Sequence, residues 1–185
     1  SYISVLKSIL TNLMQESKLE IGPIRAIKIF KALILLPKGI NTDLILAKIK
    51  PVLTDAMNNK NTTRSDGRFL NPEESTQFSL LLIDICWQFY LDHKQMPDWL
   101  YSLAEKEACR LAYRLEPDGC LPDWSGENKR NSLTSEIYKA SLVFDRDDLR
   151  FIGVCGRRYQ DAYPPIEKNF YFNEIGETII RTNWN

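Results

Sequence analysis

The sequence offers few residues that could bind a metal ion. It has one histidine, His93, and four cysteines that lie far apart without any C-x-x-C pair. Structural zinc sites need closely spaced Cys and His ligands, so no metal site is expected. Cys86 and Cys109 fall within apolar helical segments and are predicted to be buried thiols. The sequence also lacks a phosphate loop, a dinucleotide fingerprint and a Ser/His/Asp motif, so no cofactor is expected.

The sequence also lacks a surplus of one charge and a long apolar run. Its 24 basic and 24 acidic residues give a net charge of zero, which argues against a nucleic-acid partner bound through overall charge. No segment approaches the roughly 18 apolar residues that a membrane span requires. The chain begins SYISVLKSIL, which shows no signal peptide, and we expect any targeting segment to lie upstream.

Apolar residues recur with helical spacing through most of the 185 residues. This spacing predicts helices over residues 5–13, 24–34, 44–53, 72–90, 98–115, 135–144 and 147–154. Pro51 is expected to kink or cut the third of these. The fourth begins with Asn71, Pro72 and Glu73, which is favourable start chemistry, and its apolar residues predict burial on most sides.

The end of the chain changes from helical to alternating spacing. Residues 169–184 are rich in aromatic and β-branched side chains around Gly176, which predicts two strands. Strands need partners along their edges, so we expect a β domain to begin here and to continue beyond the chain. The predicted organisation is mainly α: antiparallel helix pairs over residues 1–165, then the first strands of an antiparallel β domain over residues 166–185. Helix pairs of this kind build solenoids or α/α toroids.

Several motifs follow one another in a characteristic order. They are Asp66-Gly67, then Glu73-Glu74-Ser75-Thr76-Gln77-Phe78-Ser79 at the start of a long apolar helix, then Pro117-Asp118-Gly119 and Leu121-Pro122. In this order and spacing the chain resembles the late toroid of heparinase II/III-like polysaccharide lyases. The tail FNEIGETIIRTNW resembles the first strand of that family's β-sandwich, with Gly176, Arg181 and Trp184 matching.

The resemblance implies an incomplete α/α toroid and β-elimination on a uronic acid polysaccharide in bacterial polysaccharide metabolism. Elimination needs donors that neutralise the carboxylate and a base that removes the adjacent proton. The family's motif Tyr falls here on Phe78 and the following His on Ser79, so the catalytic set is not intact. The family's Asn-His pair would fall near Glu20-Ile21-Gly22, where there is no His. The resemblance also implies a periplasmic or extracellular location.

Four residues are candidates for binding the polysaccharide. Glu73 could contact sugar hydroxyls, although acids at a helix start are favoured by the dipole alone. Arg25 and Arg68 could pair with a uronate carboxylate or simply be solvated. Trp124 could stack on a sugar ring or pack within the protein. Phe78, without the resemblance, is typical of core.

Three functions stay open from the sequence. The first is a polysaccharide lyase, of which this chain alone is expected to be inactive. The second is a non-catalytic relative that binds acidic polysaccharide, and the third is a helical scaffold for a protein partner. An α/α-toroid hydrolase would need two carboxylates, for which Asp66 and Glu73 are candidates. In the first two cases the partners are an acidic polysaccharide and the remainder of the β domain.

Overall fold

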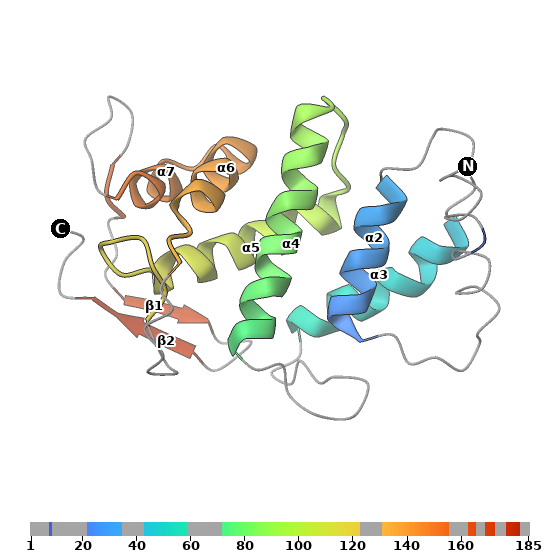
Figure 1. The fold of residues 1–185 in the computed structure, drawn as a ribbon, viewed down its shortest axis with the longest axis horizontal. Coiled ribbons are helices and arrows are strands. Elements are labelled where there is room, and N and C mark those ends of the chain that lie inside the picture. The colour runs from blue at the N-terminus through green and yellow to red at the C-terminus, as the bar shows by residue number, and fades with distance from the viewer. Residues whose placement is uncertain are drawn as a thin grey trace. The chain divides into compact units, whose positions relative to one another are not determined.

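The computed structural model describes residues 8, 22–34, 43–58, 72–122, 131–155, 163–165, 169–172 and 177–181. The chain divides into two compact units, Ser1–Phe78 and Ser79–Asn185. The described elements are six helices and two strands (Figure 1), which confirms the mainly α prediction. The predicted helix over residues 5–13 lies outside the described residues, apart from the helical Ser8.

Two helices of the first unit, α2 (Pro23–Ile34) and α3 (Asp43–Asn58), pack against each other. Pro23 occupies the first helical position of α2, where its missing N–H costs nothing. One stripe of α2 is buried: Ala26, Ile27, Phe30 and Leu33. Ile49 and Leu53 of α3 are buried too. The predicted apolar periodicity of both helices is therefore confirmed.

Pro51 lies inside α3 and does not cut it, because the helix continues to Asn58. A helical proline removes the hydrogen bond to the carbonyl four residues earlier, which here belongs to Ala47. Ala47 and Pro51 are both exposed, so water can reach that carbonyl. Of the two predicted outcomes, the cut is wrong, because the lost bond falls on the solvent side of the helix, and the kink stays a prediction.

Helix α4 (Pro72–Leu91) begins where the cap chemistry placed it, with Pro72 followed by Glu73 and Glu74 in its first turn. The division between the two units falls inside this helix. Its middle is deeply buried at Phe78, Ser79, Leu82, Ile83, Ile85 and Cys86. Tyr90 and Leu91 are exposed, so the prediction of burial on most sides fails in the last turn. Among the described residues, no helix combines the length and the apolar character that crossing a membrane would require.

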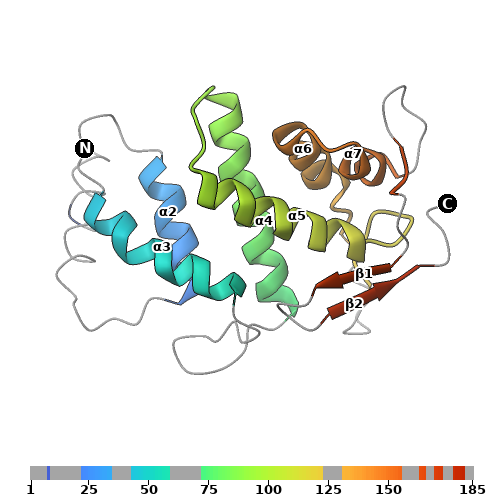
Figure 2. The ribbon, with the colours of Figure 1, turned by 180° about the vertical axis from the view of Figure 1, so that it is seen from behind.

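The second unit contains α5 (Asp98–Arg114), α6 (Thr134–Phe144) and α7 (Asp147–Gly153). Figures 1 and 2 show α6 and α7 side by side next to α5, and each contacts the other two. Gly153 explains the close approach of α6 and α7. A Cβ on this residue would lie 2.7 Å from the backbone nitrogen of Tyr138, so only glycine fits.

The predicted Pro-Asp-Gly turn follows α5. The Gly119 N–H donates to the Glu116 carbonyl, and the Cys120 N–H donates to the Asp118 carboxylate at 3.0 Å. Gly119 has a φ of +79°, in the left-handed region that favours glycine. The Leu133 N–H donates to the Gly119 carbonyl, so this turn holds the segment that starts α6.

Strands β1 (Asn169–Phe172) and β2 (Glu177–Ile180) form an antiparallel pair, with Asn169 opposite Ile180 and Phe172 opposite Glu177. The two predicted strands are thus confirmed. Arg181, just after β2, donates to the carbonyls of Tyr113 and Leu115 at the end of α5. These bonds satisfy carbonyls that a helix end leaves without partners. The predicted domain boundary between residues 165 and 166 stays a prediction.

Candidate functional site

Two positions of α4, Phe78 and Ser79, align with the Tyr and His of the lyase motif, and both are buried. The side chain of Phe78 is 3% exposed and that of Ser79 is 0% exposed. The interpretation of Phe78 as a core residue is therefore confirmed. A long helix with an apolar middle has to cover this part of its surface, which is why both positions point away from water.

Ser79 belongs to a buried polar cluster with Glu107 and Arg110 of α5. The Ser79 hydroxyl donates to Glu107 Oε2 at 2.6 Å. Arg110 donates to the same carboxylate, from Nη2 at 2.6 Å and from Nε at 3.1 Å. Arg110 Nη2 also lies 3.3 Å from Ser79 Oγ. The three side chains thus join α4 to α5 within the second unit.

The chemistry of this cluster is structural. The charges of Glu107 and Arg110 neutralise each other, and the bidentate contact gives the ion pair a fixed geometry. Burial without such pairing would be very costly, so each member depends on the others. A hydroxyl that donates to a buried carboxylate is not positioned to serve a substrate.

The sequence of α5 carries a signal for this cluster. On α5 the apolar stripe runs through Leu100, Leu103, Ala104, Ala108 and Leu111. Glu107 lies on this stripe, three residues after Ala104 and seven after Leu100, where a charge is out of place. A charged residue on an apolar stripe indicates a buried partner, and Arg110 follows at the next helical neighbour.

Two of the four predicted binding residues, Arg25 and Glu73, lie in the described part of the chain. Arg25 on α2 and Glu73 on α4 are both exposed, and no hydrogen bond or ion pair between described residues joins them. Arg68 and Trp124 lie outside the described residues, as do Asp66, Glu20 and Ile21. The predicted role of these residues in binding stays a prediction.

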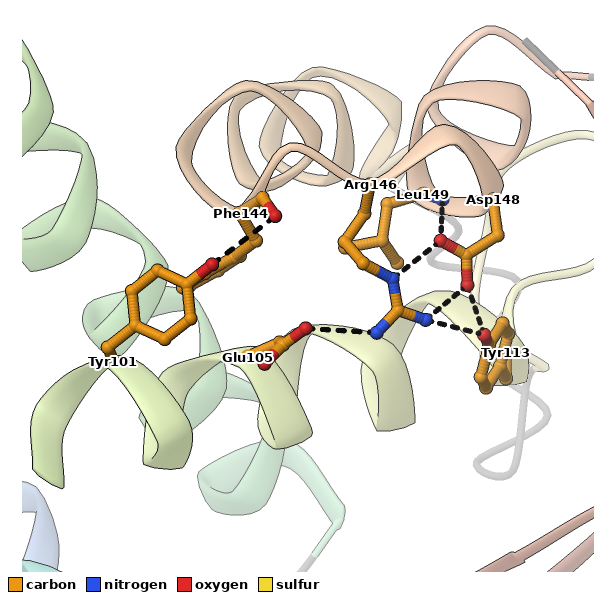
Figure 3. Close-up of polar contacts among 7 residues, drawn as sticks. All are labelled: Tyr101, Glu105, Tyr113, Phe144, Arg146, Asp148 and Leu149. Carbon is orange, nitrogen blue, oxygen red and sulfur yellow. Dashed lines mark hydrogen bonds and ion pairs between the residues drawn. The ribbon is translucent and has the colours of Figure 1, made fainter. Parts of the chain in front are cut away.

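A second polar cluster joins α5 to α7 (Figure 3). Arg146 donates to Asp148 from Nε at 2.9 Å and from Nη2 at 2.5 Å, and to Glu105 Oε1 at 3.0 Å. The Tyr113 hydroxyl donates to Asp148 Oδ2. The N–H of Leu149 donates to Asp148 Oδ1 at 2.9 Å. Every polar atom of the Asp148 carboxylate therefore has a partner.

This environment shifts the pKa values of all three central groups. Burial disfavours the charge on Asp148, but the hydrogen bonds from Arg146 and Tyr113 outweigh it and hold its pKa below the usual range. The bond to Asp148 raises the pKa of Arg146. Burial, reinforced by the bond to Asp148, raises the pKa of Tyr113. Tyr113 therefore stays protonated and is not a candidate base.

The Asp148 contacts make the stability of the second unit depend on pH. Because the folded pKa of Asp148 is depressed, its contribution is present above the unfolded pKa and is lost as pH falls through the folded pKa. We expect Asp148→Asn to lower the free energy of unfolding at neutral pH by about 1.5–3 kcal/mol, the cost of losing hydrogen bonds to a charged group. Urea unfolding across an acid pH series measures both the loss and its flattened pH dependence.

Asp147→Asn is the matched control for this change. Asp147 is the preceding residue and pairs with Arg150 at 3.1 Å, but its side chain is 56% exposed. An exposed pair contributes less than about 1 kcal/mol. Equal losses from the two variants would contradict a special role for Asp148.

Cys86 and Cys109 are both buried and free of disulfides. The prediction of buried thiols is therefore confirmed, and burial raises the pKa of both to about 12. Within the described residues, no group of three or more His, Cys, Asp or Glu side chains is placed to hold a metal ion.

A scan against protein-family models, a search of curated proteins and a search of solved structures each found no match. The likeness to heparinase II/III-like lyases therefore rests on the order of the sequence motifs.

Proposed function

We propose that this chain is the helical part of a relative of heparinase II/III-like polysaccharide lyases that binds acidic polysaccharide without cleaving it. The order of its turns and helix starts supports the assignment to this family. The family in turn supports an acidic polysaccharide as the ligand. In this proposal α2 to α7 belong to an incomplete α/α toroid, and β1 and β2 begin a β-sandwich. A periplasmic or extracellular location belongs to the same proposal.

The observation that carries the non-cleaving part is the burial of Phe78 and Ser79. A general acid or base has to come within hydrogen-bond reach of the substrate. Phe78 has no proton to transfer and is 3% exposed. Ser79 is fully buried and donates to Glu107, which Arg110 already neutralises. The place where the lyases carry Tyr and His is thus filled by core and by a structural ion pair.

Tyr113 does not supply the missing hydroxyl. It is 6% exposed and donates to Asp148. Its raised pKa keeps the phenol protonated at neutral pH, so it cannot remove a proton from a sugar. Tyr113 therefore does not replace the motif Tyr.

We expect no elimination by this chain on a panel of uronate polysaccharides, such as polygalacturonate, alginate and heparan sulfate. Elimination leaves an unsaturated uronate that absorbs in the ultraviolet, so the absorbance of each incubation measures it directly. Binding is measured separately by affinity electrophoresis in gels that contain the same polymers, where we expect retardation.

Phe78→Tyr is the control for the catalytic position. Because the ring is buried, we expect the restored hydroxyl to stay out of reach of substrate and the variant to remain inactive. An absorbance increase with the parent chain would overturn the non-cleaving proposal. An increase with Phe78→Tyr alone would show that burial does not keep this position from the substrate. An absence of retardation in every uronate gel would overturn the binding proposal.

A further inference from the structure

Helix α2 carries charges of one sign. Its sequence, PIRAIKIFKALI, contains Arg25, Lys28 and Lys31 and no acidic residue. The whole chain is neutral, with 24 basic and 24 acidic residues, so this excess is local. The three cations follow each other at intervals of three residues, which makes them neighbours on the helix surface.

Arg25 and Lys28 lie on the face opposite the buried stripe. Both are exposed, whereas Ala26, Ile27 and Phe30 are buried. Neither forms an ion pair with another residue in the described ranges of the chain. Lys31, which is half-buried, continues the row toward the end of the helix.

The arrangement of these cations disfavours folding. Like charges on neighbouring helical positions repel each other. Arg25 is also in the first turn, where the positive end of the helix dipole disfavours a cation. A row of alternating acidic and basic residues would keep this helix face solvated and would also form stabilising ion pairs. The row is therefore better explained by a partner than by solvation alone.

The shape of the row indicates the kind of partner. At a rise of about 1.5 Å per residue, the backbone positions from Arg25 to Lys31 span about 9 Å along the helix. That spread suits a linear chain with repeated anionic groups better than a single small anion. The guanidinium of Arg25 can hold a carboxylate with two parallel hydrogen bonds, and a lysine acts as a point charge.

We propose that Arg25 and Lys28, continued by Lys31, bind successive carboxylate groups of an acidic polysaccharide chain. This inference rests on the proposed function above and assigns its polymer to one face of α2. Because the cations are exposed, the interaction is screened by salt, and binding weakens as ionic strength rises.

The test compares two double variants that remove the same charge from the same unit. Arg25→Gln/Lys28→Gln removes the row, and Lys48→Gln/Lys50→Gln removes two exposed lysines of α3. Binding to polygalacturonate is measured by isothermal titration calorimetry at low and at physiological salt, and circular dichroism checks that each variant is folded. We expect the α2 variant to bind about fivefold to tenfold more weakly, since exposed ion pairs are individually modest. The α3 variant should bind as the parent does.

The remaining arms separate this inference from the proposed function. If both double variants weaken binding equally, the proposal that the α2 row is the binding site is overturned, while polysaccharide binding by the chain remains. The same titrations are repeated with dextran, a neutral polymer. If the α2 double variant and the parent chain then bind equally, the contact depends on charge. Binding to duplex DNA as tight as to polygalacturonate would overturn the polysaccharide as the partner. A parent chain that binds no uronate polymer would overturn both the row and the proposed function.

Discussion

Glu107→Met is expected to lower the free energy of unfolding by about 3–5 kcal/mol, the cost of breaking a buried ion pair by removing one partner. The substitution leaves the Arg110 guanidinium buried, with a side-chain exposure of 9%, and without the carboxylate that neutralises it. It also removes the acceptor of the Ser79 hydroxyl. Urea denaturation followed by circular dichroism measures the change.

A double variant distinguishes the pair from the individual residues. Glu107→Met/Arg110→Met replaces both charges by apolar side chains, which is often close to neutral for a buried pair. We therefore expect the double variant to be more stable than Glu107→Met alone. Glu105→Met on the same helix is the control, because its partner Arg146 is 34% exposed and the pair is worth up to about 1 kcal/mol. A double variant less stable than Glu107→Met alone would contradict the account.

Gly119→Ala is expected to lower the free energy of unfolding by about 2–5 kcal/mol. The added methyl would lie 2.2 Å from Cγ2 of Thr134, and its residue would keep a φ of +79°. Overpacking typically costs about 1–3 kcal/mol, and a left-handed conformation costs other residues about 1–2 kcal/mol. Thermal and urea unfolding of the purified variant measure the sum.

Thr134→Ser separates the two causes, because serine lacks Cγ2 but keeps the hydroxyl that lies 3.1 Å from Ser132 Oγ. In the Gly119→Ala background this second change should recover the part of the loss that is due to Thr134. It should leave the backbone part and the close contacts at 3.2 Å with Cys155 Sγ and Ser132 Oγ. Ser135→Ala, an exposed neighbour on α6, should change stability by less than about 0.5 kcal/mol. No recovery in the double variant would show that the clash with Thr134 is not the cause.

The helices were predictable because each has an apolar period and punctuation at its ends. Pro72 with two glutamates fixed the start of α4, and the Pro-Asp-Gly turn fixed the end of α5. The two strands were predictable from their alternation around Gly176. The sequence left open whether Pro51 would kink or cut its helix, and the structure excludes the cut. The cost of a helical proline depends on whether the freed carbonyl meets water, and a linear pattern does not show this.

The contents of the site were less predictable, since they depend on which helices meet. Phe78 and the buried cysteines followed from periodicity alone. The partners of Ser79 lie 28 and 31 residues further along the chain, and only the packing of α4 on α5 brings them together. Likewise, the bond from Tyr113 to Asp148 crosses 35 residues of the chain. Local patterns predict burial, whereas pairing between distant residues needs the fold.

The attachment of Arg181 to the end of α5 has a consequence for local opening. Its guanidinium occupies the carbonyls of Tyr113 and Leu115, so the last turn of α5 cannot fray while the contact persists. Conversely, a hairpin of two short strands is barely stable in isolation and draws order from that anchor. Helix end and hairpin thus open as one cooperative segment, with a shared opening free energy rather than two independent ones.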